Sequence, residues 1–174
     1  MALRQILIEP NPALRQKSLP VDSVDEGLQQ LINDMLETMY AAPGIGLAAI
    51  QIGVPKRVIV LDIDQKEGQK KPMVFVNPEI IIKSENYSSY EEGCLSVPGQ
   101  FAEINRPEKC NIKYLDFYGE KKEIEATGML ATCIQHEIDH LEGILFIDYL
   151  SKLKKSMIVK KLSKHKKELE RIVV

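Results

Sequence analysis

Two histidines stand four residues apart in the segment His136-Glu137-Ile138-Asp139-His140. On a helix, residues with this spacing lie on one face, one turn apart. Neutral imidazole is the commonest metal ligand among side chains, so the pair can bind one ion. Glu137 follows the first histidine and can reach a water molecule on that ion. The His-Glu-x-x-His pattern is typical of metal-dependent hydrolases that cleave amide bonds.

The alternative is a solvated helix that carries two histidines by chance. The chain contains only three histidines, and two of them belong to this motif. The preceding residues 128–135 are mostly apolar, which predicts a buried helix. Because buried histidines need polar partners, we favour a metal site.

The composition is typical of one globular domain. With 174 residues, 44% hydrophobic and 28% charged, we expect residues 1–174 to form a single catalytic domain with its own core. The net charge of −2 gives no strong attraction to nucleic acid or membrane. We expect no membrane span and no signal peptide. The three cysteines are irregularly spaced, so we expect reduced thiols and a cytoplasmic location.

Hydrophobic periodicity predicts an α+β fold. After an extended arm at residues 1–21, a helix is expected from Asp22 or Ser23 to about Tyr40, before Pro43-Gly44. Strands are expected at 57–62, 73–76, 79–83, 94–97, 110–117 and 121–126, with a polar loop that contains a short strand at 84–93 and a turn at 98–99. The histidine motif lies on a helix over about 127–141, and a last helix begins near residue 151. We therefore expect antiparallel strands packed around a central metal-binding helix, with an N-terminal and a C-terminal helix.

Two histidines do not complete a catalytic metal site, which usually has three protein ligands and one open position. The familiar continuation His-x-x-Gly-x-x-His is followed through Gly143, but Phe146 stands where the third histidine would be. The class of metal-dependent hydrolases that uses this third histidine is therefore disfavoured. A downstream carboxylate is an alternative ligand, and Glu142, Asp148 and Glu168 are weak candidates.

A thiolate is the other candidate for the third ligand. Cys133 lies three residues before His136 on the same helix face, but a small buried cysteine is the simpler interpretation. Cys110 begins a predicted strand, so we expect it in the core. Cys94 lies between Gly93, which permits close backbone approach, and a predicted strand. The residues alone leave its role as a ligand open.

Three separated blocks of the sequence resemble the peptide deformylase family. They are Gly44-Ile-Gly-Leu-Ala-Ala-Ile-Gln51, Glu92-Gly-Cys-Leu-Ser96 and Gln135-His-Glu-Ile-Asp-His140, in the family's order and spacing. The segments between them are also similar, so the resemblance covers nearly the whole chain. Three blocks together are highly specific, because nothing in a structural helix requires the other two.

The resemblance implies a role for each block. Cys94, His136 and His140 are implied as metal ligands, with a water molecule in the fourth position. Glu137 is implied as general acid and base, which fits a carboxylate that takes a proton from that water. The side-chain amide of Gln51 and the backbone N–H of Leu95 are implied as donors to the developing oxyanion.

The substrate implied by the resemblance is the N-formyl-methionyl end of a newly made bacterial polypeptide, hydrolysed to formate and a free N-terminus. The residues implied to line its binding site are Ile45, Gly46, Gly93, Met129, Thr132 and Cys133. Ordinary core packing is the alternative for those on the helix. Thr132 is more polar than the aliphatic residue expected there. Phe101 replaces an arginine that many relatives carry.

The resemblance also implies one divalent metal ion. We expect iron(II) as the native ion, while zinc, nickel or cobalt can occupy such a site. A Cys-His-His set does not choose among these ions, because affinity and availability both matter. If iron is native, oxidation of the iron or the thiolate should inactivate the enzyme.

The C-terminal residues 151–171 are expected to form a basic helix within the same domain. Eight lysines fall between Lys152 and Lys167, with His165 among them. The apolar stripe consists of Leu153, Met157, Ile158 and Leu162. A solvated amphipathic helix packed by one edge is the simpler interpretation. The resemblance to longer bacterial deformylases suggests contact with ribosomal RNA near the nascent-chain exit. We expect a monomer that does not bind membranes.

Two other functions are compatible with parts of the sequence. A zincin-like peptidase would cut internal peptide bonds and use a carboxylate as third ligand in place of Cys94. A ribosome- or RNA-binding module would use the basic helix and a structural metal. A structural site is usually closed by four protein ligands, and Glu137 would then have no task.

Overall fold

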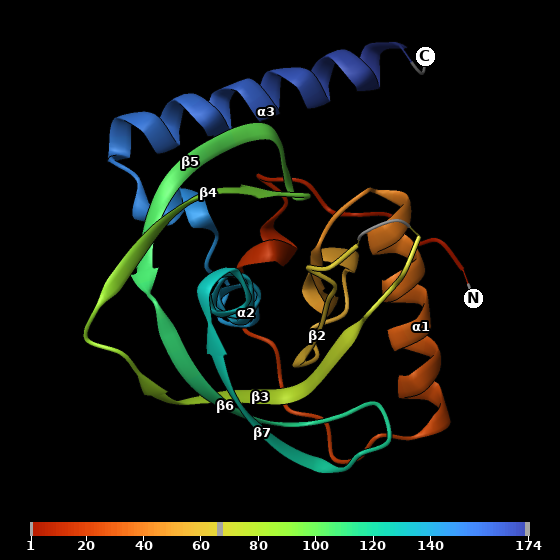
Figure 1. The fold of residues 1–174 in the computed structure, drawn as a ribbon. Coiled ribbons are helices and arrows are strands. Elements are labelled where there is room, and N and C mark those ends of the chain that lie inside the picture. Colours follow the sequence, from red (N-terminus) through yellow and green to blue (C-terminus); the bar gives the residue numbers. More distant parts are fainter. Residues whose placement is uncertain (1, 66–67, 173–174) are drawn as a thin grey trace.

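The helix α2 (Gly128–Leu141) runs through the middle of the structure, a computed structural model that describes residues 2–65 and 68–172. Figure 1 shows α2 end-on with strands around it, while α1 (Glu26–Ala41) and α3 (Lys152–Ile172) lie on the outside. The expected α+β fold, with antiparallel strands around a central helix, is confirmed.

One antiparallel sheet separates α1 from α2. Its strands, in spatial order, are β1 (Gly46–Ala48), β2 (Val58–Leu61), β3 (Met73–Lys83), β6 (Lys109–Leu115) and β7 (Lys121–Thr127). Successive side chains of a strand point to opposite faces. Val58 and Val60 therefore pack in the core beneath α1, while Ile59 and Leu61 pack in the core around α2. This double burial explains why β2 is apolar throughout.

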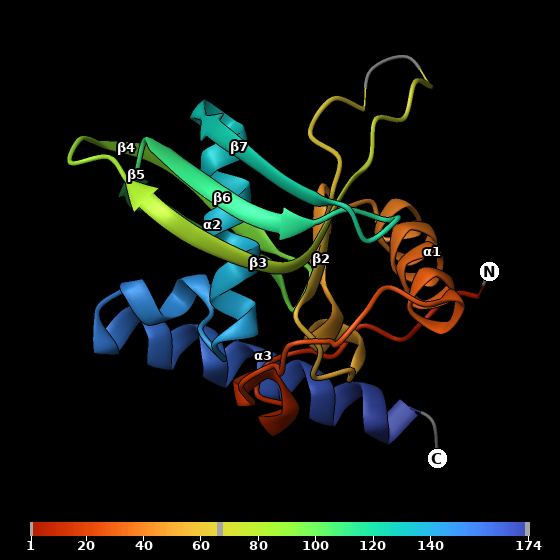
Figure 2. The same ribbon diagram turned by 90° about the horizontal axis from the view of Figure 1, so that it is seen from below.

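The side of α2 that faces this sheet is apolar. Its buried residues are Ala131, Ile134, Ile138 and Leu141, which cluster with Phe75 of β3 and Ile112 of β6. Full burial of one such large side chain stabilises the fold by roughly 1.5–3 kcal/mol. Figure 2 shows α2 behind β3 and β6, so the sheet covers one side of the helix.

A separate antiparallel pair, β4 (Tyr87–Cys94) and β5 (Val97–Pro107), covers the opposite side of α2. The pairing is regular up to Gly93 opposite Phe101 and then shifts, so that Cys94 pairs with Val97. Such an irregularity bends a strand and re-aims the side chains next to it. Here it precedes the tight turn at residues 95–96 and presents Cys94 to α2.

The expected boundaries are wrong at several points. The side chain of Asp25 accepts a hydrogen bond from the backbone N–H of Leu28 at 2.8 Å, so α1 begins after Asp25 and not after Asp22 or Ser23. The expected strands 73–76 and 79–83 form the single strand β3, because pairing with β6 resumes at Glu79 after a shift at Asn77, which adopts a left-handed φ of 50°.

The region around Cys94 also differs from expectation. The short strand expected within residues 84–93 is longer than predicted and forms β4 up to Cys94, the expected strand 94–97 contains a turn at 95–96, and β5 continues through the expected turn at 98–99. Long-range pairing between β4 and β5 overrides the local preference of polar, proline and glycine residues in each case. The short elements β1, η1 (Pro12–Arg15), η2 (Ala49–Ile52) and η3 (Phe146–Tyr149) were not predicted, because they span too few residues to show a period.

The helix α3 packs by one edge, as the simpler interpretation predicted. Leu162 is buried and Ile158 half-buried against a cluster that includes Phe146 and Ile147, whereas Leu153 and Met157 are exposed. In the part of the chain that the structure describes, no helix has the length and apolar character that a membrane span requires.

The C-terminal end of α2 depends on a glycine. Gly143 has a φ of 76°, its N–H donates to the carbonyl of His140, and the N–H of Ile144 donates to the carbonyl of Asp139. These bonds form a Schellman motif, in which glycine is preferred because it adopts the left-handed conformation without strain. A Cβ at residue 143 would also overlap the backbone carbonyl of Arg15 in the N-terminal arm.

Gly143→Ala should therefore lower the free energy of unfolding by more than about 2 kcal/mol, since it combines the strain of a left-handed alanine at the end of α2 with a backbone clash. Gly68→Ala is a matched control: Gly68 has a φ of 77° and nothing lies within 4 Å of a Cβ there. The Gly68 variant should lose only about 1 kcal/mol of the free energy of unfolding. Urea denaturation measures both values. Equal losses in the two variants would contradict the proposed contact between Gly143 and the arm.

Candidate metal centre

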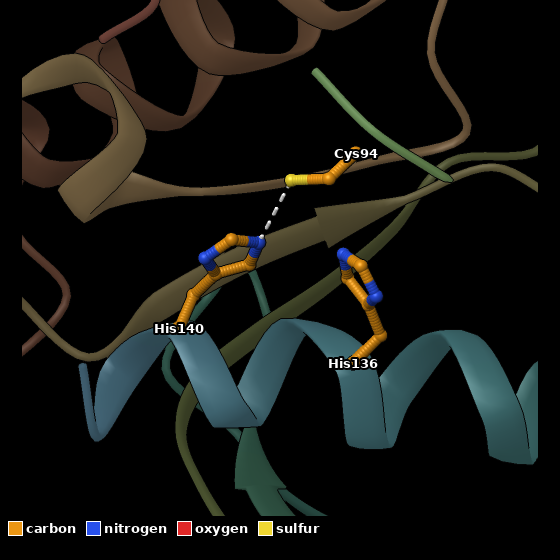
Figure 3. A group of neighbouring side chains, drawn as sticks. All are labelled: Cys94, His136 and His140. Carbon is orange, nitrogen blue, oxygen red and sulfur yellow. Dashed lines mark hydrogen bonds between the residues drawn. The ribbon is translucent and has the colours of Figure 1, made fainter. Parts of the chain in front are cut away.

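One ligand atom from each of Cys94, His136 and His140 lies within 4.8 Å of the other two. The sulfur of Cys94 lies 3.3 Å from Nε2 of His140. Figure 3 shows both imidazoles rising from α2 towards the cysteine, which comes from the β4–β5 pair. A thiolate with two imidazoles is a donor set that suits zinc, iron and related ions, and it leaves one position open on a four-coordinate ion. The residues therefore fit a catalytic type of metal site.

A buried carboxylate fixes the orientation of His136. Nδ1 of His136 lies 2.8 Å from Oε1 of Glu92, and both side chains are less than one-tenth exposed. An ionised carboxylate only accepts hydrogen bonds, so the imidazole donates from Nδ1 and keeps the lone pair of Nε2 free for a metal. Although burial opposes a charge on Glu92, hydrogen bonds from His136 and Arg106 lower the pKa of this carboxyl.

Arg106 completes this buried network. Its guanidinium donates to both oxygens of Glu92, at 2.7 and 2.9 Å, and to Oδ2 of Asp139 at 2.8 Å. Bidentate pairs of this kind fix the geometry of both partners. Glu92 is thus held from one side by Arg106 and faces His136 on the other.

Their surroundings shift the pKa values of the two imidazoles in opposite directions. Burial lowers the pKa of His140 well below its ordinary value of 6.5, so this imidazole is neutral and ready to bind a metal. Burial acts in the same direction on His136, but the neighbouring Cys94 and Glu92 outweigh it and raise the pKa of that imidazole well above 6.5. A metal ion at Nε2 of His136 would replace the second proton.

Glu137 lies beside the three ligands in an enclosed position. Its side chain is buried, and Oε2 has no hydrogen-bond partner among the described residues. Burial raises the pKa of Glu137 to about 7. Gly46 makes room for this carboxylate, since a Cβ there would lie 2.5 Å from Oε1 of Glu137. A buried carboxylate without a partner is an unusual arrangement and indicates a group that acts on a bound molecule.

The amide of Gln51 is oriented by three contacts. Its Oε1 accepts a hydrogen bond from the backbone N–H of Ala48 at 2.9 Å. Its Nε2 donates to Oγ of Ser96 at 3.0 Å and lies 3.5 Å from the sulfur of Cys94. The N–H donors of this amide therefore face the candidate metal centre. Leu95 lies in the turn after Cys94, on the wall of the same cavity.

A cavity of about 570 Å³ opens beside these residues, a volume typical of sites for small ligands. The residues expected to bind substrate all line it, namely Ile45, Gly46, Gly93, Met129, Thr132 and Cys133. Ile45 and Met129 are partly exposed at its edge, and the ring of Phe101 lies against Gly93. Phe101 thus presents an exposed apolar ring where the family pattern predicted a charge. The hydroxyl of Thr132 is buried and lacks a hydrogen-bond partner among the described residues.

The structure separates the other candidate ligands from the centre. Glu142 forms ion pairs with Lys17 and Arg57, and Asp148 pairs with Arg15 and Lys155. Cys110 is buried in the core around α2, Glu168 and His165 are exposed on α3, and Phe146 packs beside the ring of His136. Among the described residues, Cys94 therefore joins the two histidines and no carboxylate does.

Sequence reasoning missed the partners of the ligands. Glu92 stands two residues before Cys94 in a matched block, and its buried place in β4, next to the exposed Glu91, was not recognised. Arg106 and Asp139 come from β5 and α2, far from Glu92 in the chain. No local pattern of residues indicates that these three side chains meet.

Comparison with known proteins agrees with this site. The family model described as polypeptide deformylase matches residues 3–156. The chain belongs to the polypeptide deformylase family. Peptide deformylase from Pelagibacter ubique is 64% identical over 174 residues, which cover 100% of both chains. Every residue of the candidate centre lies inside the matched range, whereas α3 extends beyond it.

Solved structures of the family share the fold. The crystal structure of peptide deformylase from Ehrlichia chaffeensis has a TM-score of 0.91 and 39% identity, covering 96% of this chain and 98% of that one. Peptide deformylase from Legionella pneumophila has a TM-score of 0.90 and 49% identity, covering 98% of this chain and 99% of the other. The resemblance found in three sequence blocks is therefore confirmed over nearly the whole fold.

Cys94→Ala should abolish stoichiometric binding of Co²⁺, because two imidazoles alone hold a divalent ion weakly. Cys133→Ala is the matched control, since burial raises the pKa of that thiol to about 12 and keeps it protonated. Equilibrium dialysis followed by metal analysis measures bound ion per chain. Full binding by the Cys94 variant would contradict its place as a ligand.

Proposed function

We propose that this chain is a metal-dependent hydrolase that removes the N-formyl group from the N-terminal formyl-methionine of newly synthesised polypeptides and releases formate. The main support is the position of Glu137, a buried carboxylate at the wall of an open cavity beside Cys94, His136 and His140. One of its oxygens has no hydrogen-bond partner among the described residues. Membership of the polypeptide deformylase family supports the same reaction.

Cys94, His136 and His140 would hold the metal ion. When bound, a divalent ion supplies Lewis-acid chemistry, which lowers the pKa of a water molecule and polarises a carbonyl oxygen. We propose iron(II) as the native ion, with zinc, nickel and cobalt as alternatives that suit the same thiolate and imidazole ligands. Glu92 keeps the Nδ1 proton of His136 in place and so holds that imidazole in the tautomer that binds metal.

Glu137 moves the proton in this mechanism. Its carboxylate takes a proton from the attacking water as the water oxygen bonds to the formyl carbon. The same group then donates a proton to the amide nitrogen as the carbon–nitrogen bond breaks. The products are formate and a peptide with a free amino group. Enclosure of Glu137 behind Gly46 keeps bulk water from competing for this proton.

Gln51 and Leu95 stabilise the charge that develops on the formyl oxygen. The Gln51 amide is fixed by Ala48 and Ser96, so its donors are oriented before substrate arrives. The backbone N–H of Leu95 is the second proposed donor. Loss of one preorganised donor of this kind typically costs about 3 kcal/mol of the activation barrier.

The cavity beside the centre would take the methionine side chain. Thr132 and Cys133 of α2 and Ile45 from the loop before β1 form part of its wall, with Met129 at the edge. An unbranched thioether fits an apolar cavity of this kind. Gly46 and Gly93 flank the cavity, where they can offer backbone groups to an extended peptide.

The competing functions have less support. A zincin-like peptidase needs a carboxylate ligand, and within the described residues the candidate ligand group contains none. A structural metal in an RNA-binding module would need a fourth protein ligand and would leave Glu137 without a task.

The basic helix α3 supports a second part of the proposal. Most of its lysines, including Lys160, Lys164 and Lys167, are exposed, whereas Leu162 holds the helix to the domain. We propose that this face contacts ribosomal RNA near the nascent-chain exit. We also propose that the chain works as a monomer in the cytoplasm, where nascent chains are made and where Cys94, Cys110 and Cys133 stay reduced.

Glu137→Gln should lower turnover of a formyl-methionyl tripeptide by at least about 100-fold, because it removes proton transfer but keeps the side-chain shape. Bound metal should stay at the wild-type level. The exposed Glu103→Gln serves as the control and should keep wild-type turnover. Formate release and metal content are measured on the same samples. Wild-type turnover by the Glu137 variant would refute the proposed role.

Neutralising three exposed lysines of α3 (Lys160, Lys164 and Lys167→Gln) should weaken ribosome co-sedimentation by at least about tenfold at low salt, because lysine–phosphate contacts dominate such binding.

The matched control neutralises three exposed lysines of β6 and β7 (Lys109, Lys113 and Lys121→Gln), which changes the net charge equally. Both variants should hydrolyse a formyl-tripeptide normally. Equal co-sedimentation of the two variants would count against a specific contact through α3.

A further inference from the structure

The hydroxyl of Tyr149, in the short helix η3, donates a hydrogen bond of 2.7 Å to Oδ2 of Asp139. Its ring lies against the guanidinium of Arg106, 4.9 Å from the ring centroid to Cζ. Tyr149 itself is half-exposed. A tyrosine at the surface therefore contacts two members of the buried network that orients His136.

The contacts continue without a gap to the metal centre. Oδ2 of Asp139 accepts both the Tyr149 hydroxyl and Nη1 of Arg106. Arg106 donates through its other two nitrogens to Glu92, and Oε1 of Glu92 also lies 2.8 Å from Nδ1 of His136. Each step in this series is a hydrogen bond of 2.7–2.9 Å between side chains. A change at Tyr149 can therefore reach His136 through three intermediate side chains.

The guanidinium of Arg106 is held in one position by two carboxylates, Glu92 on one side and Asp139 on the other. It is almost fully buried, whereas the Asp139 side chain is 19% exposed and lies at the border with solvent. A carboxylate in that place can rotate unless a second donor fixes it. The hydroxyl of Tyr149 supplies that donor. The ring of Tyr149 covers the guanidinium of Arg106 from the solvent side.

The helix η3 is itself held firmly, so Tyr149 has a fixed position from which to act. Asp148 pairs with Arg15 and with Lys155, in each case at 2.6 Å. Phe146 is buried and lies nearly parallel to the ring of His136, with centroids 6.2 Å apart and an interplanar angle of 25°. One short helix thus contacts His136 directly through Phe146 and indirectly through Tyr149.

We propose that Tyr149 is a positioning residue for the metal centre, which acts through Asp139, Arg106 and Glu92 to hold His136 in the orientation that retains the ion. The proposal rests on the metal site of the proposed function but not on the identity of the substrate. The simpler alternative is a hydrogen bond that only ties η3 to α2.

Tyr149→Phe removes the hydroxyl and keeps the ring. The Co²⁺-loaded variant should lose its ion to a chelator about 3- to 10-fold faster than wild type, a smaller effect than the 10- to 100-fold typical of direct partners of a ligand. The visible absorption spectrum of bound Co²⁺, which reports the ligand arrangement, should also change. Tyr87→Phe is the matched control, because Tyr87 lines the same small surface pocket as Tyr149 and is similarly exposed.

A second variant tests the route. Asp139→Asn should also accelerate metal loss, and adding Tyr149→Phe to it should have little further effect if Tyr149 acts through Asp139. If the double variant instead loses metal faster than Asp139→Asn by the full factor that Tyr149→Phe causes alone, the two residues act independently and the proposed route is overturned. Thermal unfolding of each metal-free variant separates loss of the ion from loss of the fold.

The outcomes distinguish the two proposals. If wild-type protein binds no Co²⁺, the metal site and the proposed function fail together. If wild type binds the ion but Tyr149→Phe releases it at the wild-type rate with an unchanged spectrum, only the positioning role fails. A lower unfolding temperature with unchanged metal release would mean that the hydroxyl merely ties η3 to α2.

Discussion

The orientation of His136 depends on the buried carboxylate of Glu92, which lies between that imidazole and the guanidinium of Arg106. Removing charged groups from water costs free energy, so such a network is weak evidence for stability. Its effect is geometric, because it fixes the proton on Nδ1 of one ligand and directs the other nitrogen to the centre. The fold surrounds α2 with strands on both sides and thereby encloses this network.

The helix α2 serves two purposes on two faces. Ile134, Ile138 and Leu141 pack against the sheet and fix the position of the helix. The other face carries His136 and His140 towards Cys94, the last residue of β4. Glu137, next to His136, lines the cavity beside these ligands. The hydrophobic core fixes the axis of α2, and the irregular pairing of β4 with β5 fixes the position of Cys94. The distances among the three ligands therefore follow from packing on both sides of the helix. Sites built on helices and strands position their ligands more precisely than sites built on loops.

The motif on α2 could be predicted from sequence because helical spacing is a local property: His136 and His140 had to share a face. The role of Cys94 was left open by the residues alone and came from the resemblance of three blocks, since its approach to α2 depends on a long-range pairing shift after Gly93. The same pairing explains why the strand within residues 84–93 is longer than the short strand expected there, and why residues 98–99 were wrongly expected as a turn. Glu92, Arg106 and Asp139 meet only after three elements have packed, so no spacing rule could bring them together.

The most direct test of the account measures formate release from a formyl-methionyl tripeptide by protein purified without oxygen, with metal content measured on the same samples at graded loading. The account predicts that turnover rises in proportion to bound iron and reaches its maximum near one ion per chain. Absence of turnover at one bound ion per chain, after loading with iron and with nickel, would contradict it.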